Sequence, residues 1–193
     1  MQTNVLKAIF KNNQTVYSFS ELLLLTKSTE RGLRASLTYY ISTNDLYHIR
    51  RGLYAKDINY NKLELATKIL TPAYISFETV LRNAGIIFQH YSQIFVASYQ
   101  AREIICDNQT YTFKSITSRI LTDTLGVKIL DNYSIATPER AFLDTAYLNK
   151  NYHFDNLEPL NWDQVYKILP IYGNNRSLQK RVEAYHDTLR KGL

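Results

Sequence analysis

The chain has 193 residues, of which 45% are apolar and 21% charged, an ordinary composition for a folded soluble protein. No apolar run approaches the length that spans a bilayer, and no apolar segment with a small-residue cleavage site opens the chain, so we expect a cytoplasmic protein without a membrane partner. The single cysteine, Cys106, excludes an internal disulfide and a multi-cysteine zinc site. Four scattered histidines lack metal-ligand spacing, so we expect neither a metal nor another cofactor.

The net charge of +6 is distributed unevenly along the chain. Residues 1–55 contain seven lysines and arginines against three acidic residues, whereas residues 56–193 contain sixteen basic and fourteen acidic residues. A basic excess concentrated near the N-terminus is typical of a segment that binds an anionic polymer, because binding releases counterions from the phosphates.

The first two elements are expected to be helices. Residues 3–12 place Val5, Leu6, Ile9 and Phe10 on one face of a short helix. A second helix should run to Lys27 behind the capping box 18–21, in which a serine and a glutamate cap each other's backbone N–H groups.

The segment 28–55 predicts a third helix followed by a hairpin. Ser28 is the expected N-cap, and the helix buries an apolar stripe that includes Leu33 and Leu37. Two short strands then flank Arg51 and Gly52, where glycine supplies the positive φ of a tight turn. Three helices followed by such a hairpin form a winged helix-turn-helix, whose third helix enters a major groove while the wing meets phosphates.

The exposed side chains of this unit are the candidate contacts to double-stranded DNA. The guanidinium groups of arginines near the start of the third helix can donate two hydrogen bonds to the edge of a guanine base. Basic residues at the hairpin can contact phosphates. The alternative is a solvated helix in which Arg34 pairs with Glu30. The predicted contacts are Lys27, Thr29, Arg31, Arg34, Thr38, Arg50 and Arg51.

Residues 58–193 predict a separate α+β domain with a small, mainly antiparallel sheet and several helices, following a DNA-binding domain at residues 1–57. Expected helices lie at 63–70, 77–84 (capped by Ser76), 162–169 and 177–189, and strands at 93–99, 102–106, 110–116 and 134–136. A further helix opens at Thr137 (N-cap) and Pro138 (N1).

The opening of that helix contains three charged residues that could suggest an active site. Glu139 suits the helix dipole, and Arg140 and Asp144 are spaced i, i+4, so we interpret them as a structural pair on or near the surface. No catalytic residue is assigned. A nuclease would need a carboxylate cluster beside a strand lysine, and Asp107 with Lys114 is the nearest approach.

Three stretches, in this order and spacing, resemble the AbiEi-type antitoxins of type IV toxin–antitoxin systems. They are IRRGLYA at 49–55, LA at 65–66 with AYIS at 73–76, and ATPERAFLD at 136–144. The resemblance covers the chain to about residue 148. It implies a winged-helix repressor that binds operator DNA with inverted repeats in its own promoter. It also implies a C-terminal domain that counteracts a nucleotidyltransferase-like toxin encoded beside it.

A second hypothesis is a nucleic-acid-processing enzyme, or a subunit of one, that uses a winged helix for targeting. Metal-dependent cleavage of DNA by the purified protein would separate it from the antitoxin hypothesis.

Overall fold

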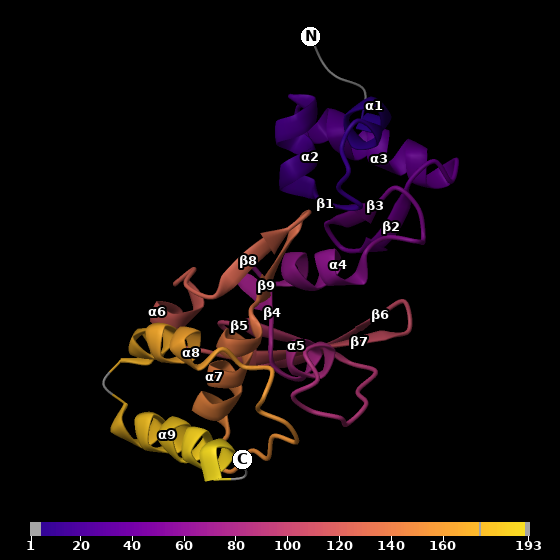
Figure 1. Ribbon diagram of the computed structural model, residues 1–193. Helices are drawn as coiled ribbons and strands as arrows, with labels where there is room; N and C mark the ends of the chain where they lie inside the picture. Colours follow the sequence, from indigo (N-terminus) through magenta and orange to yellow (C-terminus); the bar gives the residue numbers. More distant parts are fainter. Residues whose placement is uncertain (1–4, 174, 192–193) are drawn as a thin grey trace.

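The computed structural model of the protein describes residues 5–173 and 175–191. Over these residues the fold is mixed α+β, with nine α-helices, one 3₁₀ helix and two sheets. Figure 1 shows a smaller N-terminal part above a larger part that contains both the main sheet and the C-terminal helices. Among the described residues, no helix combines the length and apolarity needed to cross a bilayer.

The N-terminal part combines three helices with a three-stranded antiparallel sheet in the order β1-β3-β2. Its elements are α1 (Val5–Phe10), β1 (Val16–Ser18), α2 (Phe19–Thr26), α3 (Glu30–Ser42), β2 (Tyr47–Arg50) and β3 (Leu53–Ala55). The sequence pattern did not predict β1, which has only three residues. The expected start of α1 at Thr3 lies outside the described residues.

Two cap predictions for this part had different outcomes. The capping box is confirmed, because the Glu21 N–H donates to Ser18 Oγ at 3.2 Å and the Ser18 N–H donates to Glu21 Oε2 at 2.7 Å. The prediction that Ser28 caps α3 is wrong. Lys27 ends α2 in the left-handed conformation, so the chain needs one more residue to turn, and Thr29 becomes the N-cap.

The two faces of strand β1 in the N-terminal sheet contribute to different cores. Side chains alternate along β1, so Tyr17 packs with Leu33 and Leu37 under the helices, while Val16 joins the core of the larger part. Leu53 and Ala55 of β3 also join that larger core. Phe10, predicted on the same face of α1 as Val5 and Ile9, is 62% exposed, whereas those two residues are buried.

The larger part contains a six-stranded sheet and the remaining helices. Its elements are α4 (Lys62–Ile69), β4 (Ala73–Ile75), α5 (Phe77–Asn83), β5 (Ile94–Ser98), β6 (Arg102–Cys106), β7 (Gln109–Ser115), α6 (Ser118–Leu121), β8 (Val127–Leu130), β9 (Tyr133–Ala136), α7 (Pro138–Leu148), α8 (Trp162–Ile168), the 3₁₀ helix η1 (Leu169–Tyr172) and α9 (Arg176–Lys191). The short strands β4 and β8 were not predicted.

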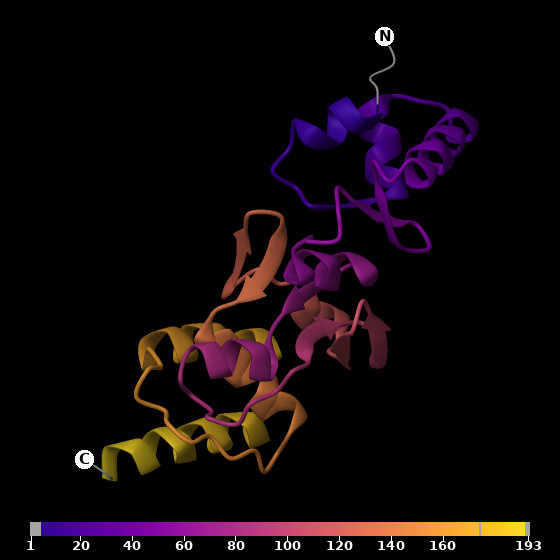
Figure 2. The same ribbon diagram turned by 90° about the vertical axis from the view of Figure 1, so that its right-hand side faces the viewer.

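The strand order is β6-β7-β5-β4-β9-β8, and pairings alternate between antiparallel and parallel. Three of the five pairings are antiparallel, so the sheet is mainly antiparallel as expected, and the two parallel pairings place β7 beside β5 and β9 beside β4. Helices α5 and α7 pack against each other, and α8 and α9 pack on α7. Helix α4 contacts both β4 and β1, and Figure 2 shows it between the two parts.

Candidate nucleic-acid interface

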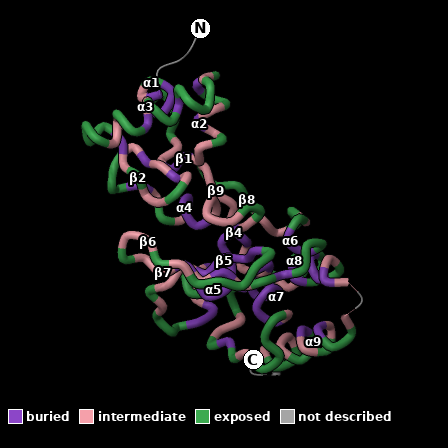
Figure 3. Tube along the Cα trace, turned by 180° about the vertical axis from the view of Figure 1, so that it is seen from behind, coloured by how far each residue is buried: buried purple, intermediate pink, exposed green. Residues whose placement is uncertain are grey.

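Helix α3 has one buried and one exposed side. Leu33 and Leu37 are buried, as the apolar stripe predicted, whereas Arg31, Arg34 and Thr38 are exposed. Figure 3 colours the outer side of this helix as exposed. Within the described part of the chain, Arg31 has no hydrogen-bond or ion-pair partner, so its guanidinium is free to meet a ligand.

Arg34 is exposed but partly held in place. Its Nη2 lies 3.9 Å from Glu30 Oε2, with both side chains about two-thirds exposed (67% and 69%). An exposed pair of this kind contributes only about 0–1 kcal/mol, so it does not withdraw the arginine from other partners. The guanidinium also lies 4.5 Å above the Phe19 ring, which orients it beside the start of α2.

The two threonines of the predicted interface use their hydroxyls within the helix. Thr29 Oγ1 accepts from the Gly32 N–H at 3.2 Å as the N-cap of α3. The Thr38 hydroxyl donates to the Arg34 carbonyl at 3.0 Å. Lys27 is exposed in the left-handed turn between α2 and α3, which leaves its ammonium group in solvent.

The hairpin of β2 and β3 turns at Arg51 and Gly52, and Gly52 has the predicted positive φ of 79°. Arg51 is exposed in this turn. Arg50 differs from the expectation of a residue at the tip: it lies in β2 opposite Leu53, and it is half-buried with its Nη1 out of contact with solvent. A register shift between His48 and Arg50 turns the arginine inward.

The pair of Arg140 and Asp144 lies in the interior, so its predicted place on the surface is wrong. Both residues are 0% exposed, and Arg140 Nε lies 3.3 Å from Asp144 Oδ1. The helix start itself is as predicted, with Thr137 as N-cap and Pro138 at N1. The intrahelical spacing was therefore right, but α7 lies between α5, α8 and α9 and is buried on almost every side from Arg140 onward.

Groups from distant elements satisfy this buried pair. The Ser76 hydroxyl donates to Asp144 Oδ2 at 2.7 Å, and the Tyr172 hydroxyl donates to Oδ1 at 2.6 Å. Ser76 occupies the N-cap position of α5, as predicted, but its hydroxyl is used here and makes no capping hydrogen bond. Burial raises the pKa of the Asp144 carboxyl, while the charge of Arg140 and the hydroxyl donors act in the opposite direction.

The same cluster satisfies Arg140 with backbone oxygens. Arg140 Nη1 donates to the Leu125 carbonyl and Nη2 to the Ile120 carbonyl, both at 2.7 Å, and Nη2 also donates to the Tyr74 hydroxyl at 3.0 Å. The cluster holds α6 and β4 on α7 and is closed to solvent, which gives it a structural role. Glu139, outside it, accepts from the Asn161 N–H at 3.2 Å.

The residues considered for a nuclease are separated. Lys114 Nζ lies 2.8 Å from both carboxylate oxygens of Glu78, between the rings of Phe77 and Phe95, and Asp107 makes other contacts. Within residues 5–173 and 175–191, no group of three or more histidine, cysteine, aspartate or glutamate side chains is arranged to hold a metal ion.

Sequence patterns missed the contacts of Asp107. Its carboxylate accepts hydrogen bonds from Tyr47 and Tyr60, which are 60 and 47 residues away along the chain. A turn aspartate and two tyrosines carry no local signal of such a contact.

No protein-family model matches the chain, and no curated protein matches it in sequence.

Proposed function

We propose that this chain is a DNA-binding transcriptional repressor, with residues 5–55 as a winged helix-turn-helix. In this proposal α2 and α3 form the helix-turn-helix, α3 is the recognition helix, and the hairpin of β2 and β3 is the wing. By the AbiEi resemblance, the repressor is the antitoxin of a type IV toxin–antitoxin operon.

The observation that carries the proposal is the position of Phe19 at the start of α2. Its backbone N–H donates to the Gly52 carbonyl at 2.9 Å, and its ring lies 4.5 Å below the Arg34 guanidinium. One residue therefore links the turn of the hairpin to the basic side of α3. A recognition helix and a wing can bind one duplex together only if they lie on the same side of the domain.

The exposed charges of this unit agree with a duplex as the ligand. Arg31, Arg34 and Arg51 are exposed, and Lys27 adds a fourth exposed cation in the turn before α3. In this proposal the helix arginines contact base edges and the wing arginine contacts a phosphate, so the two classes of contact should respond differently to DNA sequence and to salt.

The test is a fluorescence-anisotropy titration of the whole protein with DNA from upstream of its own gene and with scrambled DNA. Arg31→Ala should cost about 1–3 kcal/mol on the specific site and much less on scrambled DNA. Arg51→Ala should weaken both and lower the log–log salt slope by about 1. Arg119→Ala, which removes an exposed arginine from α6, is the control and should change neither.

The antitoxin role has its own test. The gene beside this one should encode a nucleotidyltransferase-like toxin that inhibits growth. Co-expression of the full chain described here should restore that growth. In the DNA titration, equal affinity of the wild type for upstream and scrambled DNA would contradict the proposal that the chain is a repressor. Metal-dependent cleavage of the DNA in the titration would favour the nucleic-acid-processing enzyme instead.

A further inference from the structure

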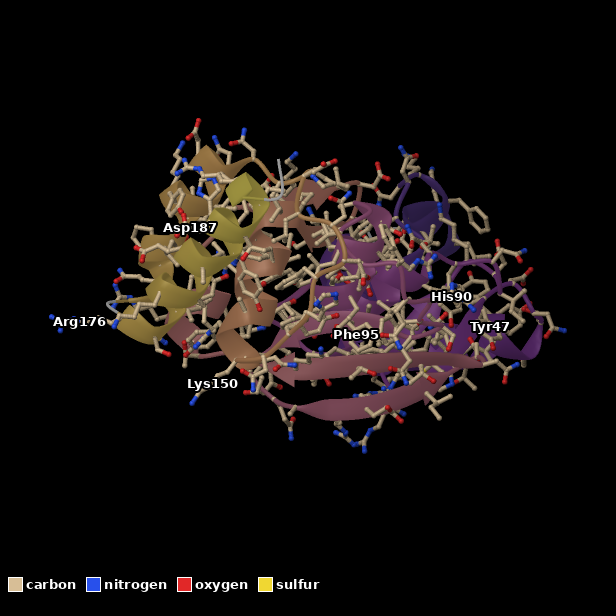
Figure 4. All side chains as sticks on the ribbon, turned by 60° about the horizontal axis from the view of Figure 1, so that its bottom comes forward. Tyr47, His90, Phe95, Lys150, Arg176 and Asp187 are labelled. Atoms are coloured by element: carbon tan, nitrogen blue, oxygen red, sulfur yellow. The ribbon has the colours of Figure 1, made fainter. Side chains whose placement is uncertain are left out.

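Asp107 joins the larger part of the protein to the hairpin of β2 and β3. The Tyr47 hydroxyl, from β2, donates to Asp107 Oδ1 at 3.0 Å, and the Tyr60 hydroxyl donates to Oδ2 at 2.6 Å. Figure 4 labels Tyr47 beside the end of the β6–β7 hairpin, where Asp107 lies. A single carboxylate thus binds one tyrosine from each side of the polar segment 56–59.

The backbone presents this carboxylate rigidly. Asp107 and Asn108 form a two-residue turn between the paired residues Cys106 and Gln109, and both have positive φ, 47° and 59°. This turn type matches the twist of the two strands that it joins. The rings of Tyr47 and Tyr60 stack with centroids 6.2 Å apart, and their hydroxyls bind different oxygens of the carboxylate.

Leu53 and Ala55 of β3 hold the hairpin on the larger part by packing in its core, and Asp107 adds the polar contact at the start of β2. Strand β2 is an edge strand of its sheet and pairs only with β3, with an interruption between His48 and Arg50. Its turn is tied to α2 through the Gly52 carbonyl, but its start is tied through Tyr47 to Asp107. Burial and the hydrogen bond to Asp107 raise the pKa of Tyr60, so this hydroxyl stays protonated and donates.

We infer that Asp107 is a positioning residue for DNA binding: through Tyr47 and Tyr60 it sets the angle of the wing against α3, and so the reach of Arg51 to the phosphates. The inference rests on the proposed function. It places control over operator affinity in a β-turn of the larger part, outside the surface that contacts DNA.

The test compares Asp107→Asn with Asp131→Asn. Asparagine retains the size of the side chain and tolerates positive φ, so the turn is kept while the charged acceptor is lost. Asp131 is a matched control because it is an exposed turn aspartate with the same φ of 47°, between β8 and β9, and its substitution makes the same change in net charge. Both full-length variants are titrated with upstream DNA at several salt concentrations.

We expect Asp107→Asn to weaken binding about tenfold and to lower the salt slope by about 1, as loss of the wing contact requires, and Asp131→Asn to stay within about twofold of the wild type. Added to Arg51→Ala, Asp107→Asn should have little further effect, because both act on one contact. A role in stability alone would not produce this non-additivity. Tyr47→Phe should reproduce part of the loss.

Two results would overturn the inference while the proposed function stands. In one, the wild type prefers its upstream DNA and Asp107→Asn binds as Asp131→Asn does. In the other, the losses from Asp107→Asn and Arg51→Ala add in full. If the wild type itself shows no preference for upstream DNA, the proposed function fails, and the inference fails with it.

Discussion

Thr15 and Glu64 meet between the two parts of the protein. The backbone N–H and the hydroxyl of Thr15 both donate to Glu64 Oε2, at 2.9 and 2.6 Å, although Glu64 belongs to α4. Glu64 is 1% exposed. Lys68, one turn further along α4, lies 3.8 Å from Glu64 Oε1 and 2.6 Å from Glu21 Oε1 at the start of α2. This ionic chain fixes α4 to the N-terminal part.

Glu64→Ala should lower the free energy of unfolding by about 1–3 kcal/mol, because it leaves the Thr15 N–H without its acceptor in a closed environment. Chemical denaturation of the full chain measures the change. Glu183→Ala, at an exposed position of α9, is the control and should stay within about 0.5 kcal/mol of the wild type. An equal effect of the two substitutions would contradict a contribution from this junction.

The pH dependence of stability should change in Glu21→Gln. Burial raises the pKa of Glu21, but the hydrogen bonds from Lys68 and Ser18 lower it by more than burial raises it. The pKa of Glu21 therefore lies below the ordinary value of 4.5. A lowered pKa in the folded state gives stability that is present above about pH 4.5 and is lost as the pH falls through the folded value.

Unfolding curves recorded from pH 7 downward should therefore show the wild type more stable than Glu21→Gln near neutrality, with the difference closing in acid. In a Lys68→Met background most of the pH-dependent difference should disappear, because the main hydrogen-bond donor to Glu21 is gone. A difference that stays constant across the pH range would show that Glu21 acts only through packing.

Asp144→Ala should be strongly destabilising, by about 3–5 kcal/mol, because it leaves the charge of Arg140 buried without its partner. The matched control is Glu30→Ala, which breaks a pair of the same i, i+4 spacing on the exposed side of α3 and should cost no more than about 1 kcal/mol. Thermal and denaturant unfolding measure both. Similar costs for the two would mean that solvent reaches the Asp144 site.

Leu143→Ala should cost about 2–5 kcal/mol, because Leu143 is fully buried in the large core and its truncation leaves a cavity. Leu24→Ala removes the same atoms from a side chain that is 79% exposed on α2, and should change stability by less than about 0.5 kcal/mol. The contrast between the two leucines in a denaturant titration tests the core directly, since their chemistry is identical.

Local patterns predicted local features. The capping box at Ser18, the apolar stripe of α3, the turn at Gly52 and the start of α7 at Pro138 depend on residues within a few positions of one another. Such features are encoded by side-chain spacing and backbone preference alone.

The burial of individual side chains and the contacts between distant elements could not be predicted in this way. The spacing of Arg140 and Asp144 indicated a pair, but Tyr74, Ser76 and Tyr172 decide that the pair is buried, and they come from other elements. The short strands β1, β4 and β8 are defined by their pairing with β3, β5 and β9 rather than by a local pattern. The hydrogen bonds from Tyr47 and Tyr60 to Asp107 form only when the segments that carry these residues are packed together.

The packing of the N-terminal sheet against two cores limits where the chain can be divided into fragments that stay folded. Val16, Leu53 and Ala55 belong to the core of the larger part, and α4 packs on β1, so a cut near residue 57 would expose an apolar surface on each side. A fragment that keeps this side of the sheet covered must therefore include α4, and it ends near Ile69 rather than in the polar segment before α4.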